Sequence, residues 1–184
     1  MIRRHGAVLL LTALLAAATS CSTGDAASGP GEVVLRVGDQ KGAGVQDMLT
    51  AAGQLDGLPY KIEWSMFTSG PPILEGVNAG AVDFGSVGNT PPVFAAASKA
   101  RIVIVGATES RTTGQAVVVP KDSPLRSPAE LKGRRVAVAK GSSAHYHLLS
   151  VLKKNGLGFD DIRPQYLQPA DALSALTGGR VDAW

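Results

Sequence analysis

The chain has 184 residues, of which 45% are hydrophobic and 18% are charged, and its formal net charge is +3. This composition is typical of one or two globular domains and excludes an intrinsically disordered chain. The sequence contains no block of Lys and Arg, so it does not indicate a protein that binds nucleic acid.

The first twenty residues have the pattern of a secretory signal peptide. Two arginines precede an apolar run from Ala7 to Ala18. That run is shorter than the roughly 20 residues that a membrane-spanning helix needs. Small residues follow it, and then comes Cys21, which is the single cysteine of the sequence. We therefore predict that residues 1–20 form a signal peptide.

The position of Cys21 resembles that of the lipidated cysteine in a bacterial lipobox. The resemblance implies that the chain is cut before Cys21 and that the thiol carries lipid. Ala18 stands where such sequences usually have leucine, and an ordinary signal peptide with an incidental cysteine is the alternative. Residues 22–32 are rich in Gly and Ser, which is typical of a flexible tether. Together these features predict an exported protein that is lipid-anchored to the outer face of the cytoplasmic membrane, or is periplasmic.

The rest of the chain contains an internal repeat. Residues 36–84 align without gaps on residues 135–183, at a constant offset of 99, with 11 identities in 49 positions. The identities fall at equivalent joints of the two copies. The sequence therefore predicts two similar lobes, which we call lobe 1 (residues 33–115) and lobe 2 (residues 116–184).

Both copies predict the same order of elements. A strand (33–39 or 134–140) leads through a Gly-containing loop into a helix (43–56 or 143–155). A second strand, a second helix and a short closing strand follow. Because strands alternate with helices, we expect an α/β fold with parallel sheets and helices on both faces.

Further elements are expected between the two copies. Thr90 precedes two prolines and predicts the start of a third helix. The apolar run at residues 101–108 predicts another buried strand, and Ser127 is placed to cap a short helix. Extended segments near residues 111–120 then join the lobes.

The loops that follow the strands are the candidate ligand site, because open parallel sheets bind ligands beyond the carboxyl ends of their strands. Four loops open helices and are rich in Gly, Ser, Thr, Asn or Gln: residues 40–44, 69–72, 88–91 and 140–144. A helix start offers unpaired N–H groups and a partial positive charge, so it attracts anions. Facing lobes would bring up to four such starts into one cleft. The alternative is that Ser142 and Ser143 only cap their own helix.

A family resemblance is carried by the stretches "GPPILEGVNAGAVDFGSVGNTPPVFAAAS", "AKGSSAHYHLLSVLKKNGL" and "RVDAW". They resemble the aliphatic-sulfonate-binding proteins of bacterial ABC importers, a branch related to taurine- and nitrate-type binders. The resemblance implies a two-lobed periplasmic-binding-protein fold of type II. It also implies capture of a small organic anion, with an aliphatic sulfonate as the first choice, and delivery to ABC permease subunits with their ATPase. Relatives continue well past "VDAW", so lobe 2 is expected to be truncated.

The resemblance further implies that loop amides and hydroxyls bind the sulfonate oxygens. Carried onto this sequence, it marks ten ligand-binding residues: Gln40, Ser69, Gly70, Asn89, Thr90, Ser142, Ser143, Tyr146, Asp182 and Trp184. Many relatives have Asp at the position of Asn89, and the neutral amide removes a negative charge near the anion. We expect no cofactor and no metal.

Several of these residues have structural alternatives. Asp83 and Asp182 occupy equivalent positions of the repeat, which favours a shared structural role at a strand start. Trp184 fits a core position as well as a cleft wall. Lys41 and Lys140 end the first strands, where they either add positive field for an anion or are simply solvated.

Other classes of function find less support in the sequence. Ser142 and His145 lack a G-x-S-x-G elbow and an orienting acid, so a hydrolase is not expected. His145 and His147 lie on different faces of the helix and do not form a metal pair. A ligand-sensing half of a transcription regulator would need a helix-turn-helix where the leader stands. Taurine, nitrate and other small oxyanions stay open as ligands.

Overall fold

The computed structural model describes residue 31 and residues 33–42, 44–109 and 114–184. The predicted signal peptide, the lipidation site Cys21 and almost all of the predicted tether lie outside the described residues. Residues Val33–Trp184 form one unit by their internal contacts. In the part of the chain that is described, no helix has both the length and the apolar composition needed to cross a membrane.

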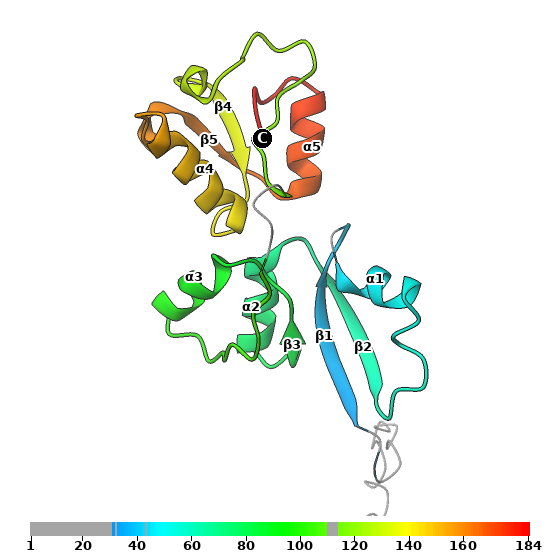
Figure 1. Cartoon of the computed structure of the whole chain (residues 1–184). Helices are drawn as coiled ribbons and strands as arrows, with labels where there is room; N and C mark the ends of the chain where they lie inside the picture. Colours follow the sequence, from blue (N-terminus) through cyan, green and yellow to red (C-terminus); the bar gives the residue numbers. More distant parts are fainter. Residues whose placement is uncertain (1–30, 32, 43, 110–113) are drawn as a thin grey trace, which may run out of the picture. The chain divides into compact units, whose positions relative to one another are not determined.

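Lobe 1 contains a three-stranded parallel sheet in the order β2–β1–β3 (Figure 1). Its strands are β1 (Val34–Gln40), β2 (Lys61–Phe67) and β3 (Phe84–Gly85), and its helices are α1 (Val45–Ala51), α2 (Gly70–Asn78) and α3 (Pro91–Ala97). Prolines occupy the first turn of α2 and of α3. Proline is favoured there because its missing N–H has no partner in a first turn and its φ already suits a helix.

Lobe 2 contains a two-stranded parallel sheet with a helix on each face (Figure 1). Its elements are β4 (Arg135–Val138), β5 (Arg163–Tyr166), α4 (Ser143–Lys154), α5 (Pro169–Thr177) and the 3-10 helices η2 (Pro128–Leu131) and η3 (Phe159–Asp161). Successive strand residues point to opposite faces. Val136 and Val138 accordingly pack with Leu148 and Leu152 of α4, and Ala137 packs with α5.

The repeat is confirmed in three dimensions. The bounds of α2 and α5 differ by the offset of 99, as do the pairings Val37–Phe84 and Val136–Ala183. The closing strand of lobe 2 is reduced to that single bridge at Ala183. The predicted α/β class, with parallel strands in both lobes, is therefore confirmed. The exact boundary between the lobes stays a prediction.

The predicted buried strand at residues 101–108 is wrong. These residues form neither helix nor strand, and Val103, Ile104 and Val105 are 83%, 73% and 74% exposed. An apolar, β-branched run indicates strand propensity, but a strand forms only where a neighbour pairs with it. Among the described residues, no strand pairs with this segment.

The short helix capped by Ser127 is confirmed as η2. The Glu130 carboxylate accepts the amide N–H groups of Arg126 and Ser127, at 2.6 and 2.7 Å. Ser127 stands at the N-cap position of η2, and its Oγ donates to the same carboxylate at 3.2 Å. The same bonds lower the pKa of Glu130, because they favour its charged form.

Candidate anion-binding site

Three of the four predicted loops meet in the structure. Gly88 has no room for a side chain, because the hydroxyl of Ser143 occupies the place that its Cβ would take. Gly70 is similarly crowded by the ring of Pro91. We call this group of loops, residues 69–72, 88–91 and 141–143, the loop junction.

Two hydroxyls of the loop junction have no partner. Ser69 Oγ and Ser143 Oγ are buried, and neither forms a hydrogen bond within the described residues. Ser69 as a whole is 4% exposed. Leaving a buried donor or acceptor unpaired costs roughly 1–3 kcal/mol, and native structures rarely do so. Both hydroxyls are therefore open to a bound group.

Ser142, in contrast, acts as the cap of α4. Its Oγ accepts the amide N–H of His145 at 3.3 Å and donates to the carbonyl of Ala139 at 2.7 Å. Its hydroxyl is therefore occupied by the turn that opens the helix. Ser142 therefore has the capping role, whereas the hydroxyl of Ser143 has no partner among the described residues.

The start of α4 also offers main-chain donors. Within the described residues, the N–H groups of Ser143 and Ala144 have no acceptor. Such groups are the orphan donors of a first helical turn and carry the positive end of the helix dipole. Together with the Ser143 hydroxyl, they form a small cluster of donors.

The other helix starts offer fewer donors. A proline stands in the first turn of α2, α3 and α5, where it removes an N–H. At α1, the buried carboxylate of Asp39 accepts the N–H groups of Val45 and Gln46, each at 2.9 Å. The expectation that four helix starts act together therefore fails at α1, because an internal anion already occupies its donors.

The remaining predicted residues differ in their surroundings. The hydroxyl of Thr90, which is 8% exposed, donates to Oδ1 of Asn89 at 3.0 Å, within the loop junction. Gln40 ends β1, and its Nε2 donates to the carbonyl of Ser86 at 3.2 Å. Tyr146 lies on α4 and is 56% exposed.

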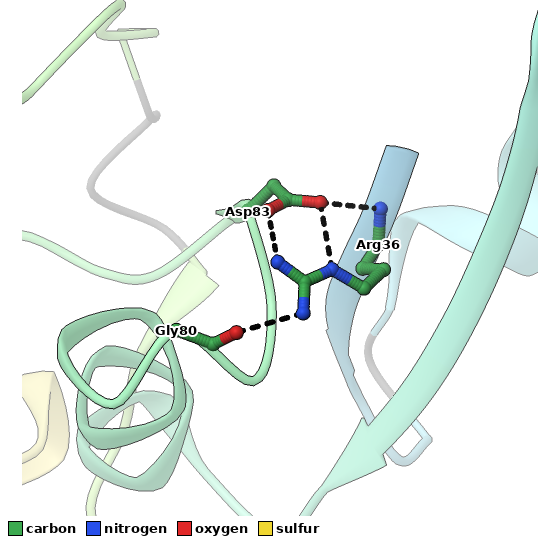
Figure 2. Close-up of polar contacts among 3 residues, drawn as sticks. All are labelled: Arg36, Gly80 and Asp83. Atoms are coloured by element: carbon green, nitrogen blue, oxygen red, sulfur yellow. Dashed lines mark hydrogen bonds and ion pairs between the residues drawn. The ribbon is translucent and has the colours of Figure 1, made fainter. Parts of the chain in front are cut away.

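Asp182 is held in an ion pair. Its Oδ1 accepts Nη2 of Arg135 at 2.7 Å, and its Oδ2 accepts Nε at 3.2 Å. Figure 2 shows the equivalent arrangement in lobe 1, where Arg36 binds Asp83 and the carbonyl of Gly80. In each case the hydrogen bond from the arginine lowers the pKa of the aspartate. This repeated geometry supports the structural alternative for Asp182.

Trp184 lies in the packing of lobe 2. Its main chain forms two hydrogen bonds with Val118, at 2.8 and 2.9 Å. Trp184 also packs against the apolar cluster formed by Ala137 and residues of α5. It also lines a cavity of ≈ 310 Å³ together with Val136 and His147. The core alternative thus finds support, and ligand contact by Trp184 stays a prediction.

Comparison with known proteins shows to which family the chain belongs. Residues 69–184 match the family described as NMT1/THI5 like. The chain belongs to this family. It is 43% identical over 173 residues to the putative aliphatic sulfonates-binding protein of Escherichia coli (strain K12), covering 92% of this chain and 54% of that protein. It is also 31% identical over 121 residues to the taurine-binding periplasmic protein of the same organism, covering 66% of this chain and 37% of that protein.

Solved structures agree with this NMT1/THI5-like assignment. The alkanesulfonate-binding protein SsuA from Xanthomonas axonopodis pv. citri, bound to MOPS, superimposes with a TM-score of 0.77 at 42% identity, covering 83% of this chain and 53% of that one. The periplasmic aliphatic sulphonate binding protein SsuA from Escherichia coli gives 0.67 at 42% identity, with the same coverage. The expected type II binding-protein fold is therefore confirmed. The chain spans about half the length of these relatives.

Sequence reasoning did not mark Gln168 of this NMT1/THI5-like chain as a candidate site residue. The Oε1 atom of Gln168 is buried and has no hydrogen-bond partner within the described residues. Gln168 precedes α5 as Ser69 precedes α2, and the two positions are equivalent at the offset of 99. The alignment of the repeat was therefore the signal that could have found it.

Proposed function

We propose that this chain belongs to an extracytoplasmic solute-binding protein that captures an aliphatic sulfonate at the loop junction. One observation carries the proposal: the unpartnered hydroxyls of Ser69 and Ser143 lie in loops that meet beside the open start of α4. The similarity to sulfonate-binding proteins supports the same ligand class. Delivery to ABC permease subunits with their ATPase is part of the proposal.

A sulfonate suits these donors chemically. It carries a single negative charge spread over three oxygens, all of which accept hydrogen bonds. The hydroxyl and amide of Ser143, the amide of Ala144 and the hydroxyl of Ser69 supply donors, and the dipole of α4 favours the charge. Hydrogen bonds to a charged group are roughly twice as strong as neutral ones. The remaining predicted residues, Gln40, Gly70, Asn89, Thr90 and Tyr146, would line the rest of the site.

Binding rather than conversion is the proposed activity. Each lobe, with the predicted boundary near residues 115–116, would supply one wall of the site. A sulfonate needs only reversible capture for import, so the proposal includes no bond-making step.

The ligand class can be tested by a ¹H–¹⁵N NMR titration of the full chain with methanesulfonate. Dimethyl sulfone is the matched control, because it keeps a tetrahedral sulfur with two oxygens and lacks the charge. We expect saturable shifts of the Ser143 and Ala144 amides with methanesulfonate and none with the sulfone. Equal shifts with both compounds, or none with either, would contradict the proposal.

Export and lipidation at Cys21 form the second part of the proposal. The motivating pattern is the Arg–apolar–small–Cys leader. We expect metabolic labelling with palmitate to mark the wild-type chain and to leave Cys21→Ala unlabelled. Equal labelling of both chains would show that the cysteine is incidental.

A further inference from the structure

His145 holds the turn that leads into α4. The N–H of Gly141 donates to Nδ1 of His145 at 3.2 Å. Gly141 has a φ of 76°, in the left-handed region that favours glycine. An imidazole nitrogen accepts a hydrogen bond only when it is unprotonated, so this contact requires the neutral ring with its proton on Nε2.

The ring of His145 is fixed by its neighbours. It lies edge-on to Phe159 of η3, with the ring centroids 5.0 Å apart, and to Tyr166 of β5, at 6.0 Å. Phe94 of α3 stacks on it at 6.5 Å. Of the groups around it, Lys140 is charged and Tyr166 is titratable, and the Nζ of Lys140 lies 5.5 Å from the centroid of the Tyr166 ring. Burial and the charge of Lys140 lower the pKa of His145, which favours the neutral form.

The bond to His145 determines which donors remain for a ligand. It uses the amide of Gly141, and Ser142 uses its own hydroxyl to cap the helix. The hydroxyl of Ser143 and the next amides are then the donors left open. A turn that lost its bond at Gly141 would sample other conformations, and these donors would no longer be held together.

We propose that His145 is a positioning residue of the anion site, which fixes the Gly141 turn so that the Ser143 donors are held ready for the anion. This inference rests on the proposed function, since it assigns His145 to the same site. It differs from a purely packing role for the ring, because it assigns the effect to one acceptor atom.

Two substitutions separate the acceptor from the ring. His145→Phe keeps an aromatic ring and removes the acceptor. His145→Asn loses the ring and keeps an acceptor oxygen near the place of Nδ1. We expect Gly141 amide exchange to become about tenfold faster in His145→Phe, and methanesulfonate binding about tenfold weaker. His145→Asn should keep both values within about threefold of the wild type, although it melts earlier.

Some of the measurements that test this inference need no ligand. Unchanged Gly141 exchange in His145→Phe, or equal loss of binding in both variants, would overturn it. The ¹⁵N spectrum of the imidazole adds a direct check, since a protonated Nδ1 in the free protein would also overturn it. If the wild type binds no methanesulfonate, the proposed function fails. The Gly141 exchange rates still show in that case whether His145 fixes the turn.

Discussion

Lobe 1 and lobe 2 have the same order of elements, but the N–H groups at the start of their first helices have different partners. In lobe 1, the carboxylate of Asp39 accepts the N–H groups that open α1. The equivalent residue of lobe 2 is Val138, which is part of the core. The start of α4 keeps its free donors and gains the hydroxyl of Ser143. A carboxylate of the chain itself thus fills the helix start in one copy of the repeat, whereas the equivalent start in the other copy keeps its donors.

The two lobes also differ in packing. Lobe 2 buries apolar side chains on both faces of its sheet, in two clusters. In lobe 1, the large apolar side chains of Met66, Phe84 and Phe94 are all more than 40% exposed. Among the described residues, more of the exposed large apolar side chains lie in lobe 1 than in lobe 2.

The largest expected effect tests this difference in packing. Leu148 and Leu49 are equivalent in the repeat, but Leu148 is 3% exposed and Leu49 is only half-buried. We expect Leu148→Ala to lower the free energy of unfolding by about 2–5 kcal/mol, because it leaves a cavity. Leu49→Ala should cost about 1 kcal/mol.

Each lobe carries one tryptophan, Trp64 or Trp184, so urea unfolding followed by fluorescence reports on both. Single-tryptophan variants would assign the signal to one lobe. Equal losses for the two leucine variants would mean that the lobes are packed alike.

The next effect tests the internal anion of lobe 1. Asp39→Ala removes the carboxylate and leaves the amides of Val45 and Gln46 unpaired. We expect a loss of about 2 kcal/mol in the free energy of unfolding, measured by urea titration. Asp47→Ala is the matched control, since Asp47 lies exposed in the first turn of α1, and it should cost only a few tenths of a kcal/mol. Similar losses in both variants would mean that Asp39 acts through its charge and not through its hydrogen bonds to the amides of α1.

The smallest effect concerns the feature that both lobes share. The pKa values of Asp83 and Asp182 are lowered by their arginine partners. A lowered pKa adds stability above the unfolded value of about 3.9, and this stability is lost as the pH falls through the folded value. We expect Asp182→Asn to flatten the acid side of the stability curve more than Asp83→Asn, because its side chain is 28% exposed against 38%. Urea midpoints measured between about pH 2 and pH 7 test this order, and identical curves for both variants would contradict it.

Much of the fold could be predicted because its signals are local. Strand and helix periods and helix-starting prolines lie in short stretches of sequence, and the repeat shows when two such series of stretches are compared. The segment 101–108 misled the prediction because strand formation depends on a partner elsewhere in the chain. The different roles of Ser142 and Ser143 depend on where α4 begins, to within one residue, which a sequence pattern does not resolve. Asp39 was overlooked because it caps α1 from the end of a strand rather than from the residue next to the helix.

We propose that Ser143 binds the anion whereas Ser142 only caps α4, and one paired measurement separates the two roles. Ser143→Ala and Ser142→Ala are each titrated with methanesulfonate and each melted without it. We expect Ser143→Ala to bind about tenfold more weakly with an unchanged melting temperature, because it loses a hydrogen bond to a charged group. Ser142→Ala should lose about 1 kcal/mol of stability and keep most of its affinity. Wild-type affinity in Ser143→Ala, together with weakened binding in Ser142→Ala below its melting temperature, would contradict the assignment.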